Sequence, residues 1–448
     1  MLKIIAIYFT NFSLYGDEAQ YWLWSQAPNL GYYSKPPLLA WFLYGYTSLF
    51  GDSFFSLKTF PIIIYFFIFL TIYKFCSSLS FSKNSSWLCA ISFLVLPAAS
   101  LSSFVISTDL LLLLFWTLSM VILLNNRKNN SVYNFFLLGL FLGIAFLAKY
   151  AAVYFILSLL LLVIIDKKTF FMFKNNPLGS MVFLLSFLLV LSPNIWWNLS
   201  NDWLTLSHTS DNANLQNINP NLYEPIKFLG AQILMVGPFL FFSFVFYIKR
   251  FSLDFENKFL LAFSLPILFV VLIEGLLVRA NANWAAPALI SVFILFFRLV
   301  SYKKTNLIKI NFVINYFIAV FLFGSILISS NNKIFHRISG VGVFASELLE
   351  IIGEKDLVVS DRIIFSNVSY QMRNKPNKIF MPYKVNTPIT NHFQMSSPLS
   401  NARKDSFFII GDLDDVSYLS KKHRGDLKRK FDVLFNSKPL MLYEVNFK

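Results

Sequence analysis

The sequence predicts an α-helical integral membrane protein with about eleven spans, followed by a small C-terminal α/β domain. Of its 448 residues, 56% are hydrophobic and only 14% are charged, whereas a soluble globular domain is about 45–50% apolar. Apolar stretches close to the ~20 residues that cross a bilayer recur up to residue 330. Beyond that point short strand-like and helix-like runs alternate, which is typical of an α/β domain.

Eleven apolar stretches are candidate spans. The first is short, because a helix of about 13 residues reaches only about 20 Å of a ~30 Å hydrocarbon core. We therefore expect it either to enter the bilayer obliquely or to belong to a segment that starts further upstream. A signal peptide is disfavoured, since no small-x-small cleavage site follows. The stretches lie near 2–15, 59–75, 87–106, 109–124, 132–148, 150–165, 178–196, 227–248, 259–277, 284–300 and 308–329.

The basic residues between these stretches predict the orientation. Fifteen of them fall in one set of alternate loops and five in the other. Since basic residues gather on the cytoplasmic side, we expect a cytoplasmic N-terminus and an extracytoplasmic tail. This placement between spans also argues against nucleic acid as the partner behind the +15 net charge. The five residues on the outer side are Lys35, Lys58, Lys149, Lys227 and Arg279.

The predicted organisation is a transmembrane part over 1–330 and an extracytoplasmic α/β domain over 331–448. Two long outer loops, 16–58 and 197–226, are rich in Trp and Tyr, whose rings prefer the headgroup zone, so we expect interfacial helices there. No internal repeat is visible, which disfavours a transporter built from inverted halves. Two cysteines, Cys76 and Cys89, exclude a disulfide framework and a zinc site.

In the tail, strand-like and helix-like runs alternate. The strand-like runs are Asp356–Ser360, Lys378–Met381, Phe407–Ile410 and Leu440–Val445; the helix-like runs are Val343–Ile352, Ile364–Arg373 and Asp414–Ser420.

Three acids on the predicted outer face are candidates for chemistry. Asp17 and Glu18 begin an expected surface helix over Glu18–Gln26, and Asp109 lies in the short turn before another span. An acid at the mouth of a helical bundle can accept the proton of an attacking hydroxyl. The alternative is that these side chains only cap helices.

Three cations lie at the same predicted level. Lys35 precedes two prolines that fix an extended backbone, and Lys149 is embedded between two apolar stretches, where an unpaired charge is costly. Arg279 follows a span that contains Glu274, a possible buried partner. Snorkelling at the interface is the alternative for Lys35. His208 is a weaker candidate, because a single loop histidine is more often only solvated.

Together these groups indicate a lipid-linked sugar phosphate as the substrate. Cations in a partly dry cavity suit a phosphate oxyanion, and a nearby carboxylate suits deprotonation of an acceptor hydroxyl. A sugar donor whose lipid tail lies in the bilayer carries its phosphate at the headgroup level, so it meets both groups.

The chain resembles the GT-C glycosyltransferases that use polyprenyl-phosphate sugars, among them the protein O-mannosyltransferases, the lipid A aminoarabinose transferases and the Rgt-type galacturonosyltransferases. The resemblance rests on the order and spacing of several stretches between residues 16 and 290. They are GDEAQYWLWS, GYYSKPPLLAW, STDLLLLLFW, GIAFLAKYAAV, SPNIWWNLSNDWLTLSHT and ANWAAPALI.

The resemblance implies roles for individual residues. Asp17 corresponds to the proposed base, with Glu18 completing the pair, and Asp109 to a second outer-loop acid. Lys35 matches a Lys-Pro motif that binds the donor phosphate, and Lys149 a basic residue at that phosphate. The other substrate-binding candidates within or beside the matching stretches are Tyr150, His208, Arg279, Asn283 and Trp284.

The sequence also departs from the family pattern. Ser34 stands where the aminoarabinose transferases have an acid, so contacts of that acid do not transfer. No segment is long enough for the β-rich insertion of the O-mannosyltransferases.

The resulting prediction is an inverting glycosyltransferase on the outer face of a bacterial inner membrane, with lipid A or lipopolysaccharide core as acceptor. The aromatic loops would close the site, and the tail would shape the acceptor entrance. No metal cofactor is indicated, because no metal-ligand spacing of His and Cys is visible and cations can hold the leaving phosphate. The alternatives are a protein O-glycosyltransferase and, from another class, a sugar-lipid transporter. The sequence specifies neither the sugar nor the oligomeric state.

Overall fold

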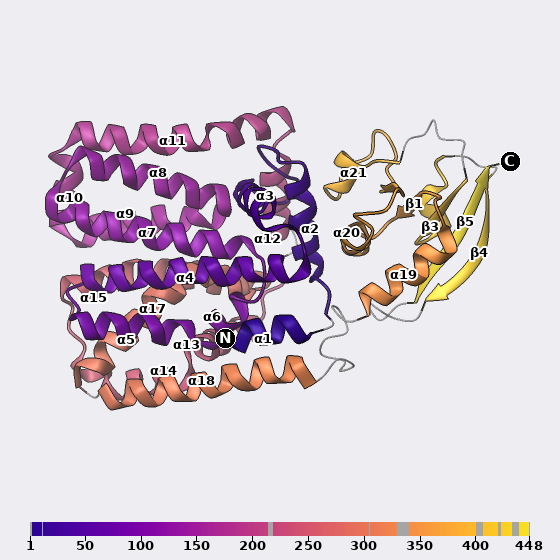
Figure 1. Ribbon diagram of the computed structural model, residues 1–448. Helices are drawn as coiled ribbons and strands as arrows, with labels where there is room; N and C mark the ends of the chain where they lie inside the picture. Colours follow the sequence, from indigo (N-terminus) through magenta and orange to yellow (C-terminus); the bar gives the residue numbers. More distant parts are fainter. Residues whose placement is uncertain are drawn as a thin grey trace. The chain divides into compact units, whose positions relative to one another are not determined.

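The computed structural model is built of helices up to residue 328 and ends in a mixed five-stranded sheet (Figure 1). It describes residues 2–10, 12–213, 218–303, 305–328, 340–399, 406–419, 423–431 and 439–447. The expected domain boundary at 330/331 and Ser420, the end of an expected helix, lie outside these residues. The chain forms two compact units: unit 1 comprises Met1–Ser34, Ala40–Leu57 and Phe323–Lys448, and unit 2 comprises Lys35–Leu39 and Lys58–Leu322.

Helices of the length of a membrane span make up most of unit 2. Among the described residues, six helical segments are long and apolar enough to cross a bilayer, or eight if each of two bent pairs is one span. The protein is therefore a multi-pass membrane protein, but the expected eleven spans are not confirmed. The helices are α4 (Phe54–Ser78), α5 (Lys83–Leu94), α6 (Pro97–Ser102), α7 (Thr108–Asn129), α8 (Val132–Ala148), η1 (Tyr150–Ala152), α9 (Val153–Ile165), α10 (Lys167–Lys174), α11 (Pro177–Ser200), α12 (Leu204–Ala213), α13 (Tyr223–Val236), α14 (Pro238–Tyr247), η2 (Ile248–Arg250), α15 (Phe255–Ala262), α16 (Leu265–Leu277), η3 (Ala282–Ala285), α17 (Ala286–Lys303) and α18 (Thr305–Ile328).

Several of the expected spans are not one straight helix. The stretch 227–248 bends by 97° between α13 and α14, where Gly237 and Pro238 interrupt it. The stretch 150–165 is followed by a bend of 106° into α10 at Asp166. In the described part of the first expected span, 2–15, the one helix is the eight-residue α1 (Leu2–Phe9).

Helix α8 packs against both α7 and α11, and the three run alongside one another in Figure 1. Two glycines one turn apart, Gly139 and Gly143, lie on the α8 face toward α11. A Cβ at Gly139 would collide with Ser186 and the Phe183 carbonyl, and one at Gly143 would lie 2.8 Å from the Cβ of Val190. Small residues at this spacing let two membrane helices approach closely. This packing fixes the ends of α7, α8 and α11, from which several candidate residues project.

Unit 1 combines the first outer loop with the tail, defined here as the described residues from 340 onward. The loop supplies α2 (Gly16–Gln26) and α3 (Leu38–Phe50), most of which belongs to this unit. The tail contributes α19 (Val341–Ile352), α20 (Arg362–Gln371), α21 (Phe393–Ser396) and η5 (Leu413–Val416) with the strands β1 (Leu357–Val359), β2 (Ile379–Phe380), β3 (Phe407–Ile410), β4 (His423–Phe431) and β5 (Leu440–Phe447).

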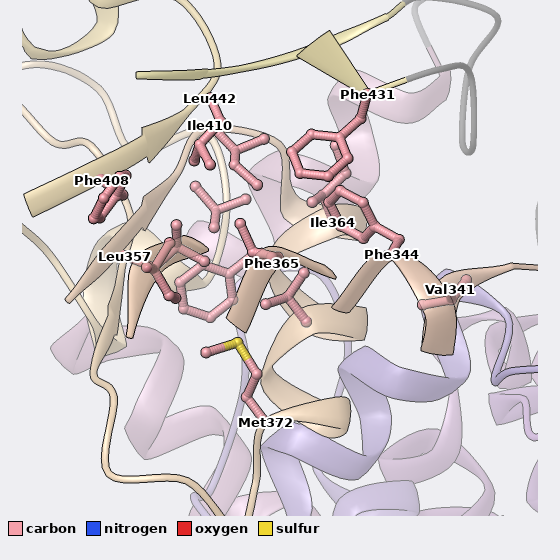
Figure 2. Packing of buried hydrophobic residues seen from close by; sticks show 14 of the residues in the cluster. Val341, Phe344, Leu357, Ile364, Phe365, Met372, Phe408, Ile410, Phe431 and Leu442 are labelled. Carbon is pink, nitrogen blue, oxygen red and sulfur yellow. The ribbon is translucent and has the colours of Figure 1, made fainter. Parts of the chain in front are cut away.

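The sheet has the order β2-β1-β3-β5-β4. β1 pairs in parallel with β2 and β3, while β5 is antiparallel to β3 and β4. Alternate strand residues enter two different cores, as the period of a strand requires. Leu357, Phe408 and Leu442 join Phe344 and Phe365 of the helices in the cluster of Figure 2, whereas Val358, Phe407, Ile409 and Val445 pack in a second cluster.

The tail secondary structure largely follows the sequence prediction. Each of the four strand-like runs overlaps a strand, and the first two helix-like runs overlap α19 and α20. The sequence did not predict β4, whose residues His423–Phe431 are mostly charged and leave their side chains largely exposed.

The prediction that the loop aromatics lie at the membrane surface is wrong for α2. Trp22 and Trp24 are each only 3% exposed. Trp22 packs edge-on to Tyr370 of α20, and Trp24 stacks on Tyr32 with His392 beside both rings. The tail covers this helix, so burial against protein replaces the expected contact with lipid headgroups.

Candidate active site

Both predicted acids, Asp17 and Glu18, lie in the first turn of α2, but their side chains differ in burial and in hydrogen-bond partners. Glu18 is fully buried, and its carboxylate accepts a hydrogen bond from the backbone N–H of Tyr15 at 2.8 Å. This contact satisfies a free amide at the helix start, so the capping alternative holds for Glu18. Its catalytic role stays a prediction.

Asp17 instead points to the tail. Its Oδ1 accepts a hydrogen bond of 3.0 Å from Nη1 of Arg362, and its side chain is 44% exposed. The same Nη1 donates to Oε1 of Gln20, one turn along α2, at 2.7 Å. A helix thus forms where it was expected, although most of its residues are buried and not at a surface. An arginine that the sequence did not single out contacts the predicted base.

Asp109 and Lys149 form an ion pair in unit 2. Asp109 lies in the first turn of α7, and Lys149 is the residue that ends α8. The Lys149 Nζ donates to Asp109 Oδ1 at 2.7 Å, and the two side chains are only 16% and 13% exposed. Ser107, not Asp109, occupies the N-cap position of α7, so capping does not explain the acid. A buried pair of this kind is costly to break, because the remaining charge loses its partner.

Tyr150 follows Lys149 directly and is held by α11. Its hydroxyl donates to Oδ1 of Asn194 at 2.7 Å and accepts from Nδ2 of Asn198 at 3.1 Å. Both asparagines are nearly fully buried. Their spacing of four residues places them on one face of α11, a polar signal inside an apolar stretch that the sequence interpretation missed.

His208 and Arg279 meet at one residue, Asn212. Nδ2 of Asn212 lies 2.9 Å from Nε2 of His208, and the Asn212 carbonyl accepts from Nη2 of Arg279 at 3.0 Å. The Arg279 guanidinium lies 5.9 Å from the ring centre of Trp284. Glu274, the expected partner of Arg279, interacts with it electrostatically. Asn283, the remaining candidate of this group, is exposed in η3.

Lys35 lies in an irregular segment between α2 and α3. The Pro-Pro pair that follows it ends this segment, directly before α3 begins at Leu38. It is half-buried. Lys35, Asp109, Lys149, Tyr150, His208, Arg279, Asn283 and Trp284 belong to unit 2, and Asp17 and Glu18 belong to unit 1.

A buried lysine, Lys58, was counted in the sequence only for orientation. Lys58 lies near the start of α4 and is 4% exposed. Its Nζ donates to the carbonyl of Phe104 at 3.3 Å and lies 4.9 Å from the centre of that ring. Phe104 precedes the turn that carries Asp109. The expected span began at residue 59, which left Lys58 in the first outer loop, whereas α4 begins at Phe54 and includes it. A buried ionisable residue in an apolar helix is a functional candidate, because its burial is costly.

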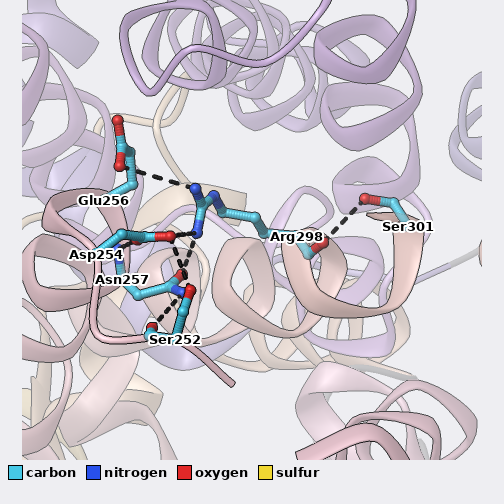
Figure 3. Close-up of polar contacts among 6 residues, drawn as sticks. All are labelled: Ser252, Asp254, Glu256, Asn257, Arg298 and Ser301. Carbon is cyan, nitrogen blue, oxygen red and sulfur yellow. Dashed lines mark hydrogen bonds and ion pairs between the residues drawn. The ribbon is translucent and has the colours of Figure 1, made fainter. Parts of the chain in front are cut away.

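A second polar cluster surrounds Arg298 (Figure 3). The guanidinium contacts Asp254 at 3.0 Å, Asn257 at 2.7 Å and Glu256 at 3.7 Å, beside a cavity of about 670 Å³. Burial raises the pKa of Asp254, but hydrogen bonds from the backbone N–H of Asn257 and from Arg298 stabilise its carboxylate. The net effect is a lowered pKa. Two carboxylates already neutralise this arginine, so the cluster fixes helix ends and does not offer a cation to a phosphate.

The described residues contain no group of three or more His, Cys, Asp or Glu side chains arranged to hold a metal ion. The expectation of a reaction without a metal stays a prediction.

Comparison with known proteins decides the class. Residues 34–197 match the family model described as dolichyl-phosphate-mannose-protein mannosyltransferase. The chain is 27% identical over 392 residues to the lipid A galacturonosyltransferase RgtD of Rhizobium johnstonii, covering 84% of this chain and 82% of RgtD. The protein is a glycosyltransferase, similar to those of the GT-C superfamily. The matched family segment contains Lys35, Asp109, Lys149 and Tyr150 of this glycosyltransferase, whereas Asp17 precedes it.

Solved structures agree with the GT-C fold. The apo crystal structure of ArnT from Cupriavidus metallidurans aligns with the glycosyltransferase at a TM-score of 0.64 and 10% identity, covering 99% of this chain and 95% of ArnT. ArnT bound to undecaprenyl phosphate aligns at 0.65 and 10% identity, covering 99% and 96%. At this identity the likeness concerns the fold alone.

Proposed function

We propose that the protein is an inverting glycosyltransferase that moves a sugar from a polyprenyl-phosphate donor to a hydroxyl of lipid A or of the lipopolysaccharide core. The names of its relatives support the two substrates. RgtD is a lipid A galacturonosyltransferase, one ArnT structure holds undecaprenyl phosphate, and the matching family model is named for a dolichyl-phosphate sugar.

The observation that carries the proposal is the nearly buried pair of Lys149 and Asp109. The pair keeps a cation in an apolar setting at the joint of two helix ends, where a phosphate oxyanion gains more from it than in water. Tyr150, tied to Asn194 and Asn198, fixes the backbone beside it. We assign the donor phosphate to Lys149, together with Lys35 and Arg279.

The reaction is a single displacement. The acceptor oxygen forms a bond to the anomeric carbon while the bond from that carbon to the phosphate oxygen breaks, so the configuration inverts. Asp17 takes the proton of the acceptor hydroxyl, and polyprenyl phosphate leaves as a monoester among the cations. In this proposal no metal is needed, because the lysines and the arginine balance the developing phosphate charge.

The proposed site faces the extracytoplasmic side of a bacterial inner membrane. The excess of basic residues in the opposite loops supports a cytoplasmic N-terminus and a periplasmic tail. This face is also where a lipid A molecule in the outer leaflet would meet the donor.

The direct test is a transfer assay with the full-length protein in lipid nanodiscs. Purified lipid A is mixed with undecaprenyl-phosphate galacturonic acid or, in parallel reactions, with other sugars on the same carrier. The masses of the products are measured by mass spectrometry. We expect lipid A to gain one sugar. Lys149→Met should abolish the gain, whereas Lys227→Met, which removes an exposed lysine that pairs with Glu224 on its own helix, should leave it intact.

Because Lys149→Met leaves Asp109 unpaired, the test includes the neutral pair Lys149→Met/Asp109→Asn. If the lysine serves the phosphate, the double variant folds and stays inactive. Full activity of the double variant would contradict the assignment.

A protein hydroxyl as acceptor is the second candidate, and the family description over residues 34–197 favours it. Sugar on a secreted peptide but not on lipid A in the same assay would support it over the first.

A further inference from the structure

We infer that Arg362, supplied by the tail, binds an anionic group of the acceptor, a phosphate or a carboxylate, directly beside the proposed base Asp17. This inference deepens the proposed function and depends on it. No pattern in the sequence pointed to this residue.

Residues at the start of both helices determine the contact between α2 and α20. Gly16 at the start of α2 abuts the Ile363 side chain so closely that a Cβ there would overlap it. Asp361 caps α20 by accepting hydrogen bonds from the N–H groups of Ile363 and Ile364 at 2.8 and 2.9 Å. These two features bring the first turns of the helices together, and Arg362 and Asp17 are the next residues along each.

Only one corner of the Arg362 guanidinium is used. Nη1 makes both contacts, to Asp17 at 3.0 Å and to Gln20 at 2.7 Å. A guanidinium has five N–H groups, and three of them belong to Nε and Nη2. Within the described part of the chain these two nitrogens have no hydrogen-bond partner, and the side chain is 44% exposed. The edge that pairs bidentately with phosphate or carboxylate is therefore open.

Arg373, just beyond the other end of α20, provides the contrast. It lies 3.4 Å from Asp52, donates to the Tyr370 carbonyl at 2.7 Å and stacks on the Tyr370 ring at 4.2 Å. Its side chain is 24% exposed. Arg373 is thus engaged by Asp52 of the first outer loop and by Tyr370 of α20. Arg362 instead makes two contacts through one nitrogen and keeps an edge for a ligand.

The open edge of Arg362 suits an acceptor that carries negative charge. Two acids, Asp17 and Glu18, begin α2, and an anionic glycolipid approaching Asp17 would meet repulsion there. Arg362 places a cation at the point of approach, and Asp17 and Gln20 hold the guanidinium in a fixed orientation. An anion on the acceptor bound at Nε and Nη2 would then lie next to the carboxylate that receives the proton.

The test compares two acceptors that differ only in charge: lipid A with its phosphates and the same lipid A after dephosphorylation. Initial rates are measured with the full-length protein in nanodiscs, varying acceptor at saturating donor and then the reverse. We expect Arg362→Ala to raise KM for the phosphorylated acceptor about 10-fold or more, the scale of a lost charge-assisted hydrogen bond, and to leave KM for the donor unchanged.

Three further comparisons complete the test. The dephosphorylated acceptor should respond little to Arg362→Ala, and Arg362→Lys, which keeps the charge without the fork, should restore part of the affinity. Arg373→Ala, the matched control at the other end of α20, should leave both KM values unchanged.

Two results would overturn the inference. A rise in donor KM would assign Arg362 to the donor phosphate. Equal losses on both acceptors, reproduced by Arg373→Ala, would make it a structural link between loop and tail.

Binding of the two glycolipids, read by fluorescence anisotropy, needs no turnover and separates this inference from the proposed function. If no sugar is transferred but Arg362→Ala still weakens binding of only the phosphorylated lipid, the anion site stands and the reaction is wrong. If binding is the same for both lipids and both proteins, the anion site is wrong.

Discussion

Two ion pairs of this protein have opposite settings. Lys149 and Asp109 lie at the joint of α7 and α8 with side chains 16% and 13% exposed, whereas Arg362 and Asp17 meet between α20 and α2 with both side chains 44% exposed. The first pair joins two neighbouring membrane helices. The second joins an outer loop to the tail, 345 residues apart in sequence.

The difference separates a permanent contact from an exchangeable one. In the buried pair, neither charge can leave without exposing the other to an apolar interior. In the exposed pair, water can replace either partner at small cost. A proton acceptor must be reachable by its substrate, so the exposed acid suits the base and the buried pair suits a fixed cation site.

The largest effect should come from the exposed acid. Asp17→Asn keeps the shape of the side chain but removes its ability to take a proton, so we expect a rate loss of about 10²- to 10⁴-fold. The thermal midpoint should hardly change. Steady-state rates and calorimetry on the same preparation measure both, and Asp52→Asn serves as control. A fully active Asp17→Asn would remove Asp17 from the role of base.

Breaking the buried pair should lower the stability of the protein. Lys149→Met leaves Asp109 unpaired, and we expect a loss of about 3–5 kcal/mol in the free energy of unfolding. Adding Asp109→Asn should recover most of it. Denaturant unfolding in mixed micelles measures the two variants, and equal instability of single and double variants would show that the pair is not the cause.

His392 should make the region around the exposed pair sensitive to acid. Burial against Trp24 and Tyr32 lowers the pKa of His392 to about 4. The folded chain then binds fewer protons than the unfolded chain, where the histidine pKa is about 6.5. Stability is complete above pH 6.5 and falls between pH 6.5 and 4, by at most about 3 kcal/mol.

Hydrogen exchange of the α2 and tail amides in the full-length protein at pH 7.5 and 5.0 measures this change. His392→Phe, which keeps a ring without a titrating group, should flatten the response. An unchanged pH dependence in His392→Phe would assign it to other groups.

Loss of the exposed pair should barely affect stability. Arg362→Ala is expected to cost about 0–1 kcal/mol, the range of solvent-exposed ion pairs. The same denaturant series measures it. If Arg362→Ala lowered the free energy of unfolding as much as Lys149→Met, the two pairs would not differ in their contribution to stability.

The smallest effect should follow metal removal. Since the cations assigned to the donor phosphate belong to the protein, treatment with EDTA should leave the transfer rate unchanged. Loss of activity that Mg²⁺ or Mn²⁺ restores would mean that a metal supplies this charge.

The sequence predicted what depends on local pattern. Apolar length gave most membrane helices, and the Lys149 position was recognised because a charge between two apolar stretches needs a partner. Short strand-like runs predicted four of the five strands. β4 was not predicted, because its residues, His423–Phe431, are mostly charged and form an exposed edge strand.

Contacts between distant segments could not be predicted. The rings of Trp22 and Trp24 suited a membrane surface as well as a protein interior, and only the tail packed on α2 decides between them. Arg362 looked like an ordinary charged residue at a helix start. Its pairing with Asp17 depends on Gly16 and Ile363, whose contact no local pattern reveals.

The central claim is that this protein joins a sugar from a polyprenyl phosphate to lipid A with inversion. The most direct measurement uses a donor of known anomeric configuration and determines the configuration of the new glycosidic bond by NMR after a single turnover. The account predicts lipid A with one added sugar in the opposite configuration, formed by the wild-type protein and not by Asp17→Asn. A product of retained configuration, or equal product from both proteins, would contradict it.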